Sequence, residues 1–236
     1  MISEVAFARD FASFWRSATP TMDGFVRRLN KGVYTRDSLP MYSKTAASRR
    51  SFVNEVAFAA FCESVERNRS NQLAVSINDL TKEATKSVAG IVGNEDDIGN
   101  TLSKNEANDA AEQIRRLHQR LSIVEGFSSI ECRPIFPGCG IVDKCEGDIA
   151  IGGILFEIKA GDRPFRSVDL RQLLTYLTLN YAGGSRSFRA VGLVNPRVGI
   201  SFEMGVDEFC FEVGGRHPTQ LFEFIAYSLS SGDVSR

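Results

Sequence analysis

The chain has 236 residues, of which 43% are hydrophobic and 24% charged, and its formal net charge is −1. This composition is typical of a globular protein with a full core and excludes a generally basic nucleic-acid-binding protein. The apolar runs are too short to span a bilayer. The five cysteines lack paired C-x-x-C spacing, and two histidines are too few to favour a zinc site. An odd number of cysteines without a secretion signal predicts reduced thiols and a cytoplasmic location.

The N-terminal part of the chain predicts helices followed by a loop. Apolar residues at helical spacing predict a helix over 2–16, and a second short helix is expected over 21–29. Residues 30–44 are rich in Gly, Ser, Thr and Pro and predict a loop or linker. We therefore expect residues 1–44 to form an N-terminal helical segment and 45–236 to form the main α/β unit.

Residues 45–69 predict a long helix whose centre is apolar on nearly all sides, as in a buried helix. Glu55 lies inside that centre. A buried carboxylate is costly unless it is paired or binds a metal ion. Glu55 is therefore either a metal ligand, or a residue that the helix leaves at the surface or pairs with an arginine.

The next stretch is weaker in pattern. Leu73–Ile77 predicts a short strand, and 78–103 predicts a weak helix followed by a flexible loop. Residues 104–123 form a clear amphipathic helix. Glu106 lies near the apolar stripe of that helix and is an alternative to Glu55 as a buried acidic ligand. A strand is then expected over 130–136.

Gly152 and Gly153 stand between two short apolar runs and predict a two-residue hairpin turn. The turn fixes the register of the two strands, which places Ile149 opposite Phe156. Because side chains alternate between the faces of a strand, the isoleucines and Phe156 share one apolar core face.

Asp148, Glu157 and Lys159 share the opposite face of this hairpin. Two directly opposed carboxylates have Cβ atoms about 5 Å apart and repel each other. A hard cation such as Mg²⁺, which takes oxygen ligands, would reverse the sign of that interaction. Alternatively the face is simply solvated, with the charges neutralising one another and Glu146 facing Lys159.

The C-terminal part alternates helix and strand. Ser167 is expected to cap a helix that runs to about Tyr181, with Gln172 and Tyr176 projecting together from it. The buried stripe of this helix is expected to consist of Leu170, Leu173, Leu174, Leu177 and Tyr181. Further elements are then predicted, namely strands over 190–194, 200–204 and 209–213 and a last helix over 219–230. This order favours an α/β fold.

The pattern Gly147-Asp148, a gap, and then Glu157-Ile158-Lys159 on an apolar strand resembles the PD-(D/E)XK nuclease superfamily. Gly147 stands where the family has a proline. The resemblance implies a restriction-endonuclease-like core, in which a mixed central β-sheet is flanked by helices. It also implies Asp148, Glu157 and the Ile158 carbonyl as metal ligands, with Mg²⁺ as the cofactor and Mn²⁺ as a substitute.

In the same resemblance, Lys159 orients or helps to deprotonate the attacking water, and Glu55 on the upstream helix joins the metal site. The spacing of Gln172 and Tyr176 is similar to the extra motif of RecB-like members, where it positions substrate phosphate or water. Chance also explains that spacing, and so does the boundary between the polar and apolar faces of an amphipathic helix.

Basic residues gather between 159 and 197, and a basic face is suited to contact phosphates. We expect Arg163, Arg166 and Arg171 to bind DNA. The resemblance implies a Mg²⁺-dependent deoxyribonuclease, as an endonuclease in restriction, repair or phage defence, acting as a homodimer or as a subunit of a larger complex. The alternative is an inactive nuclease-fold subunit that binds nucleic acid or scaffolds a partner protein.

Overall fold

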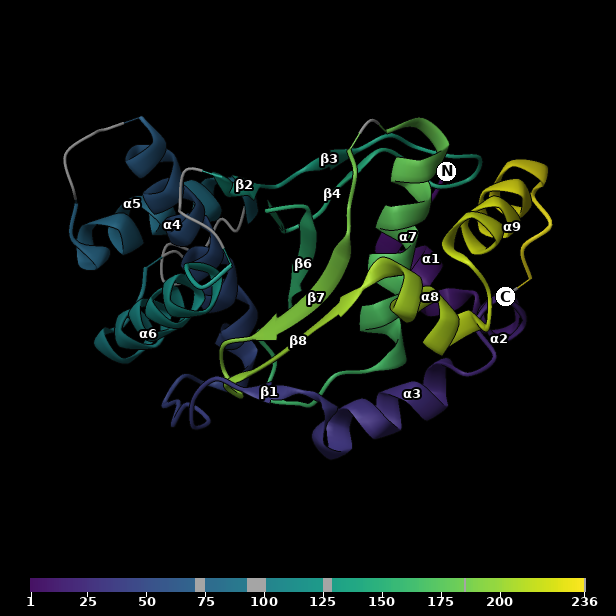
Figure 1. The fold of residues 1–236 in the computed structure, drawn as a ribbon. Coiled ribbons are helices and arrows are strands. Elements are labelled where there is room, and N and C mark those ends of the chain that lie inside the picture. Colours follow the sequence, from purple (N-terminus) through teal and green to yellow (C-terminus); the bar gives the residue numbers. More distant parts are fainter. Residues whose placement is uncertain (71–74, 93–100, 125–128, 185, 236) are drawn as a thin grey trace.

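A mixed six-stranded sheet forms the centre of the protein (Figure 1). The structure is a computed structural model, and it describes residues 1–70, 75–92, 101–124, 129–184 and 186–235. The strands follow one another across the sheet in the order β1 (Thr35–Arg36), β8 (Ile200–Gly205), β7 (Ala190–Asn195), β6 (Ile154–Ile158), β5 (Ile149–Ile151) and β2 (Glu131–Cys132). Only β6 and β7 run parallel, whereas the other neighbours in this sheet are antiparallel. The predicted α/β class, with a mixed sheet flanked by helices, is confirmed.

One face of the sheet is covered by α4 (Arg50–Arg69) and α6 (Lys104–Leu121), with α5 (Ile77–Val92) packed outside them (Figure 1). Phe61 of α4 and Leu117 of α6 contact the apolar face of the β5–β6 hairpin. That face carries the residues that alternation predicted, namely Ile149, Ile151, Ile154, Phe156 and the partly buried Ile158. The predicted core face of the hairpin is therefore confirmed.

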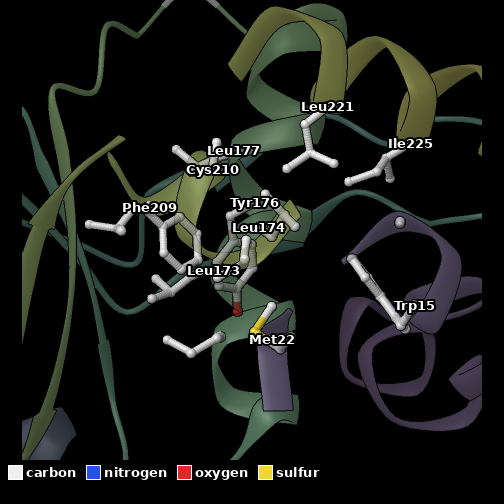
Figure 2. Close-up of a cluster of buried hydrophobic side chains, with 14 of the residues drawn as sticks. Trp15, Met22, Leu173, Leu174, Tyr176, Leu177, Phe209, Cys210, Leu221 and Ile225 are labelled. Atoms are coloured by element: carbon white, nitrogen blue, oxygen red, sulfur yellow. The ribbon is translucent and has the colours of Figure 1, made fainter. Parts of the chain in front are cut away.

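The other face is covered by α7 (Ser167–Gly183). Around it lie the remaining helices, α1 (Glu4–Asp10), α2 (Ala12–Ala18), α3 (Met22–Arg28), α8 (Val206–Gly214) and α9 (Pro218–Ser231). Figure 2 shows Trp15 and Met22 from the N-terminal helices in one cluster with Leu173 and Leu174 of α7. Residues before 45 thus share a core with the C-terminal helices, while the division at residue 44 stays a prediction.

Helix α7 connects β6 to β7, because parallel neighbours need a crossover connection. Leu155 of β6 belongs to the same cluster as α7, on the face opposite Phe156. Glu157 is on the Leu155 face, so the crossover brings its side chain to α7. The α7 residues Leu170, Leu173, Leu174 and Leu177 are buried as predicted.

The helix expected over 2–16 and the strand expected over 209–213 differ from the structure. The helix expected over 2–16 is divided at Phe11, whose ψ of 52° is not helical. The strand expected over 209–213 is wrong, because this segment lies inside α8. Val206, Phe209, Cys210 and Val213 are buried at helical spacing, which a short apolar run does not distinguish from a strand.

The strand expected over 130–136 is interrupted at Arg133, which has a φ of 54° and precedes Pro134. Its first half is β2, and its second half, β3 (Ile135–Phe136), pairs with β4 (Cys145–Glu146) in a separate two-stranded sheet. Glu146 therefore lies opposite Ile135, and the expected pairing of Glu146 with Lys159 is wrong. The carboxylate of Glu146 instead lies 3.8 Å from the guanidinium of Arg133.

Several smaller differences concern element ends. Tyr181, expected in the buried stripe of α7, is exposed and donates a hydrogen bond to Glu223. Ser167 is the first residue of α7, and its cap is Arg166. The loop predicted over 30–44 contains β1 and the end of the π-helix Leu29–Val33, and a 3₁₀ turn, Ala47–Arg49, precedes α4.

The strand expected over Leu73–Ile77 lies partly outside the described residues, and Ile77 begins α5. The loop expected after α5 lies largely outside them as well. All five cysteines are free. None of the helices in the described part of the chain has the length and apolar character that crossing a membrane requires.

Candidate metal and catalytic site

The β5–β6 hairpin positions the first carboxylate. Gly152 and Gly153 take positive φ values of 56° and 74°, as a tight hairpin turn requires. The register, with Ile149 opposite Phe156 and Ile151 opposite Ile154, is the predicted one. Asp148 directly precedes β5, and its Oδ2 accepts a hydrogen bond of 2.6 Å from the Ile158 N–H. Asp148 is thus held beside the Glu157-Ile158-Lys159 segment.

A cavity of about 240 Å³ opens beside this segment, between α4 and the end of β6. Its walls combine the predicted site residues with neighbours from α4 and the following loop, namely Ser51, Asn54, Glu55, Phe58, Asp148, Ile158, Lys159, Ala160, Gly161 and Arg163. The fold therefore brings Glu55, Asp148, Ile158 and Lys159 together, although nearly a hundred residues separate Glu55 from Asp148 in the sequence.

Glu157 contacts the cavity-lining Lys159 but does not itself line the cavity, and it is buried, with 3% of its surface exposed. Its Oε1 accepts a hydrogen bond of 2.7 Å from Lys159 Nζ. Its Oε2 is also buried and has no hydrogen-bond partner among the described residues. A buried carboxylate oxygen without a partner carries a desolvation cost that a cation or a proton would relieve.

Lys159 connects the strand to helix α7. Besides Glu157, its Nζ donates a hydrogen bond of 2.7 Å to Oε1 of Gln172. The Nε2 of Gln172 in turn donates to the hydroxyl of Tyr176 at 2.8 Å, and the Tyr176 ring stacks on Phe136. The Gln172 and Tyr176 pair thus orients the amide so that its oxygen meets the ammonium group of Lys159.

Burial shifts the titration of the acidic pair. It raises the pKa of Glu157 to about 8, and the nearby charge of Asp148 adds to the shift. Burial likewise raises the pKa of Asp148, although the Ile158 N–H and Lys159 act against it. For Lys159, burial lowers the pKa, but the ion pair with Glu157 and the charges of Asp169 and Asp148 outweigh it. The pKa of Lys159 is therefore raised.

The two candidate acidic residues from the helices lie in different places. Glu55 lies at the cavity and is exposed, so it is not buried in the apolar centre of α4, and the alternative in which the helix leaves it at the surface describes its position. Glu106 is buried, but its carboxylate accepts from the Ser103 N–H in a capping box and pairs with Arg49 at 2.9 Å. Its partners are Ser103 at the start of α6 and Arg49 directly before α4, and Glu55 is the one at the cavity.

The three arginines expected to bind DNA are placed differently from one another. Arg163 lines the cavity and makes a two-bond ion pair with the buried Asp169. Arg166 is exposed at the start of α7, where its N–H donates to Asp169. Arg171 is partly buried, and burial lowers its pKa. The structure gathers Arg163 and Arg166 at the cavity end of α7.

The donor set suits a hard cation that keeps part of its coordination for water and substrate. Within the described residues, no three His, Cys, Asp or Glu side chains are grouped closely enough to hold a metal ion by themselves. Mg²⁺ is usually bound through one or two carboxylates, with waters and phosphate oxygens completing its shell. The orphaned Oε2 of Glu157 and the adjacent Asp148 fit this kind of site.

Sequence reasoning missed three polar residues that shape the site. Asp169 holds Arg163 and the start of α7. Asn54 donates to the Ala160 carbonyl at 2.9 Å, and Asn195 donates to the Gly161 carbonyl at 2.8 Å. The signal that could have found Asn54 is its own position, since an amide inside an apolar helix needs partners.

Comparison with known proteins adds no assignment. No protein-family model matches the chain, and no curated protein and no solved structure matches it either.

Proposed function

We propose that the protein is a metal-dependent nuclease of the PD-(D/E)XK type, with a restriction-endonuclease-like core, that hydrolyses DNA phosphodiester bonds. The observation that carries the proposal is the buried Glu157, whose Oε2 lacks a partner beside Asp148 and whose Oε1 contacts Lys159. An Asp before one strand and Glu-x-Lys on its hairpin partner is the arrangement that the sequence motif requires.

Asp148 and Glu157 would hold Mg²⁺, or Mn²⁺ in its place, with the Ile158 carbonyl as a third ligand. Such an ion, when bound, lowers the pKa of a water ligand and neutralises charge on the phosphate. Placing it between the two carboxylates replaces their mutual repulsion by attraction. Glu55, exposed on the opposite wall, would contribute its carboxylate through water or by turning inward.

Lys159 would stabilise negative charge that develops on the phosphate and orient the attacking water. Its raised pKa keeps it protonated at neutral pH, which suits charge stabilisation better than proton abstraction. Gln172, held by Tyr176, fixes the ammonium group at the cavity wall. These two residues act through Lys159 in this proposal.

Arg163 and Arg166 would contact the phosphate backbone, because both lie at the end of α7 that borders the cavity. The sequence resemblance adds further expectations to the proposal. It implies endonuclease action in restriction, repair or phage defence, a cytoplasmic location, and work as a homodimer or as a subunit of a larger complex.

A second candidate function is a nuclease-fold subunit that binds nucleic acid or scaffolds a partner without catalysis. One observation favours it: Lys159 already pairs with Glu157, so the charge of that carboxylate has a partner without any cation. In that case a proton shared by Asp148 and Glu157 would satisfy the pair.

Calorimetric titration with Mn²⁺ separates the two functions. A nuclease site predicts binding heat for the wild type and its loss in Asp148→Asn. Glu146→Gln is the matched control, because Glu146 belongs to the same stretch but lies in β4, outside the cavity. Absence of Mn²⁺ binding by the folded wild type would favour the scaffold, and equal binding by Asp148→Asn would remove that residue from the site.

A further inference from the structure

The turn between β7 and β8 carries a buried ion pair that lies close to the site. Arg197 has 2% of its surface exposed, and its Nη2 lies 3.0 Å from Oδ2 of Asp109 on α6. Ser43 and Thr45 donate to the same carboxylate oxygen. A buried ion pair contributes little net stability compared with apolar residues of similar size, but its hydrogen bonds are directional.

Two chains of hydrogen bonds lead from Arg197 to the segment that follows Lys159. The Nε of Arg197 donates to Oδ1 of Asn54 at 2.8 Å, and Asn54 donates to the Ala160 carbonyl at 2.9 Å. The backbone N–H of Arg197 donates to Oδ1 of Asn195 at 3.0 Å. Asn195 then donates to the carbonyls of Gly161 and Arg163, at 2.8 and 3.1 Å.

These side-chain hydrogen bonds hold the chain between the end of β6 and the start of α7, where regular backbone pairing stops. Residues 159–166 are neither helix nor strand, so their conformation depends on such side-chain contacts. An ion pair between Arg50 and Asp162 also joins α4 to this segment, but both of its side chains are partly exposed. Exposed pairs of this kind contribute little. The amide of Asn54 is thus a partly buried link between α4 and the loop.

Asn54 is the neighbour of Glu55, and Ala160 is the neighbour of Lys159. The bond between Asn54 and Ala160 therefore joins the two walls of the cavity, one from α4 and one from β6. We infer that Arg197, through Asn54 and Asn195, is a positioning group that sets the separation between Glu55 and the Asp148–Lys159 wall. The inference rests on the proposed function, in which both walls serve one metal site.

The direct variant Arg197→Ala would leave Asp109 buried and unpaired, which is strongly destabilising. Asn54→Ala is the better test, because Asn54 is only partly buried and the ion pair stays intact. Its matched control is Ser64→Ala, which removes a hydrogen bond of 2.9 Å between α4 and His118 of α6, away from the cavity.

Three measurements are made on the full chain. Mn²⁺ affinity and cleavage of plasmid DNA are expected to fall about 10-fold to 100-fold in Asn54→Ala, with kcat reduced and KM unchanged. Hydrogen exchange of peptides that cover 159–166 is expected to become faster in Asn54→Ala. In Ser64→Ala, affinity, cleavage and exchange of this segment should match the wild type.

Wild-type Mn²⁺ affinity and kcat in Asn54→Ala, or unchanged exchange of 159–166, would overturn the inference. If the wild type itself binds no Mn²⁺, the proposed function fails separately. The exchange measurement then still decides whether Asn54 holds the segment: faster exchange supports that part, and unchanged exchange contradicts it.

Discussion

At the scale of single residues, Glu157 is a carboxylate whose charged form is disfavoured by its surroundings. It is buried beside a second carboxylate, and its pKa is raised to about 8. Because the folded-state pKa lies above the unfolded value, the folded protein binds more protons than the unfolded chain between about pH 4.5 and pH 8. The contribution of this group to stability is therefore complete below that range and is lost as the pH rises through it.

We predict that, with chelator present, the wild type loses stability relative to Glu157→Gln as the pH rises from about 4.5 to about 8. The neutral amide keeps the shape of the side chain without titrating. Urea unfolding of both proteins at several pH values measures the difference. Parallel pH curves for the two proteins would contradict the assigned shift. Saturating Mn²⁺ should remove most of the difference at high pH, because it stabilises the charged form.

Glu55 brings a carboxylate from helix α4 to the cavity. We predict that Glu55→Gln folds normally but weakens both the thermal shift given by Mn²⁺ and the cleavage activity. Glu66→Gln is the control, since Glu66 is exposed later on the same helix and pairs with Arg69. Thermal unfolding with and without Mn²⁺ is the measurement. An unchanged shift and full activity in Glu55→Gln would take Glu55 out of the site.

At the scale of elements, the contact of β6 with β7 depends on a glycine. A Cβ built on Gly192 would lie 2.3 Å from Cε1 of Phe156 and 2.7 Å from the Phe202 carbonyl oxygen. We predict that Gly192→Ala destabilises the protein by about 1–3 kcal/mol, as overpacking of a core does. Gly205→Ala is the control at the end of β8, where the added carbon would be 3.9 Å from its nearest neighbour. Equal stability of the two variants in urea would contradict this prediction.

The elements that the sequence predicted well are those with a local cause. Paired glycines set the β5–β6 hairpin, and helical spacing of leucines set α7, so their register and buried faces could be predicted. The strand expected over 130–136 failed because Arg133 and Pro134 redirect the chain to a second sheet. The alternative pairing of Glu146 with Lys159 failed for the same reason. The hydrophobic periodicity of the sequence does not reveal this change of direction.

The candidate site was predicted in part for related reasons. Asp148, Glu157 and Lys159 follow from strand alternation, and their proximity follows from the turn. The contacts of Asn54 and Asn195 with the loop after Lys159 join segments far apart in the chain. They depend on how α4 and β7 meet in three dimensions, which local patterns do not specify.

At the scale of the whole molecule, the N-terminal helices and the C-terminal helices form one core. Trp15 is fully buried and donates to the Phe7 carbonyl at 2.9 Å, within the cluster that includes Leu173. We predict that Trp15→Ala destabilises the chain by about 3–5 kcal/mol and that the whole chain still unfolds in one common transition, with a lower midpoint. Val5→Ala, at a half-exposed position of α1, is the control. Separate unfolding of a part containing Trp15 would contradict a shared core.

The proposed activity is hydrolysis of DNA by Asp148, Glu157 and Lys159 with a bound metal ion. Its most direct test is a plasmid-cleavage assay on wild type and Lys159→Ala, purified in parallel and incubated with Mn²⁺ or with chelator. We predict cleavage by the wild type with Mn²⁺, none with chelator, and none by the folded Lys159→Ala variant. Equal cleavage by both proteins, or no cleavage by a folded wild type that binds Mn²⁺, would contradict it.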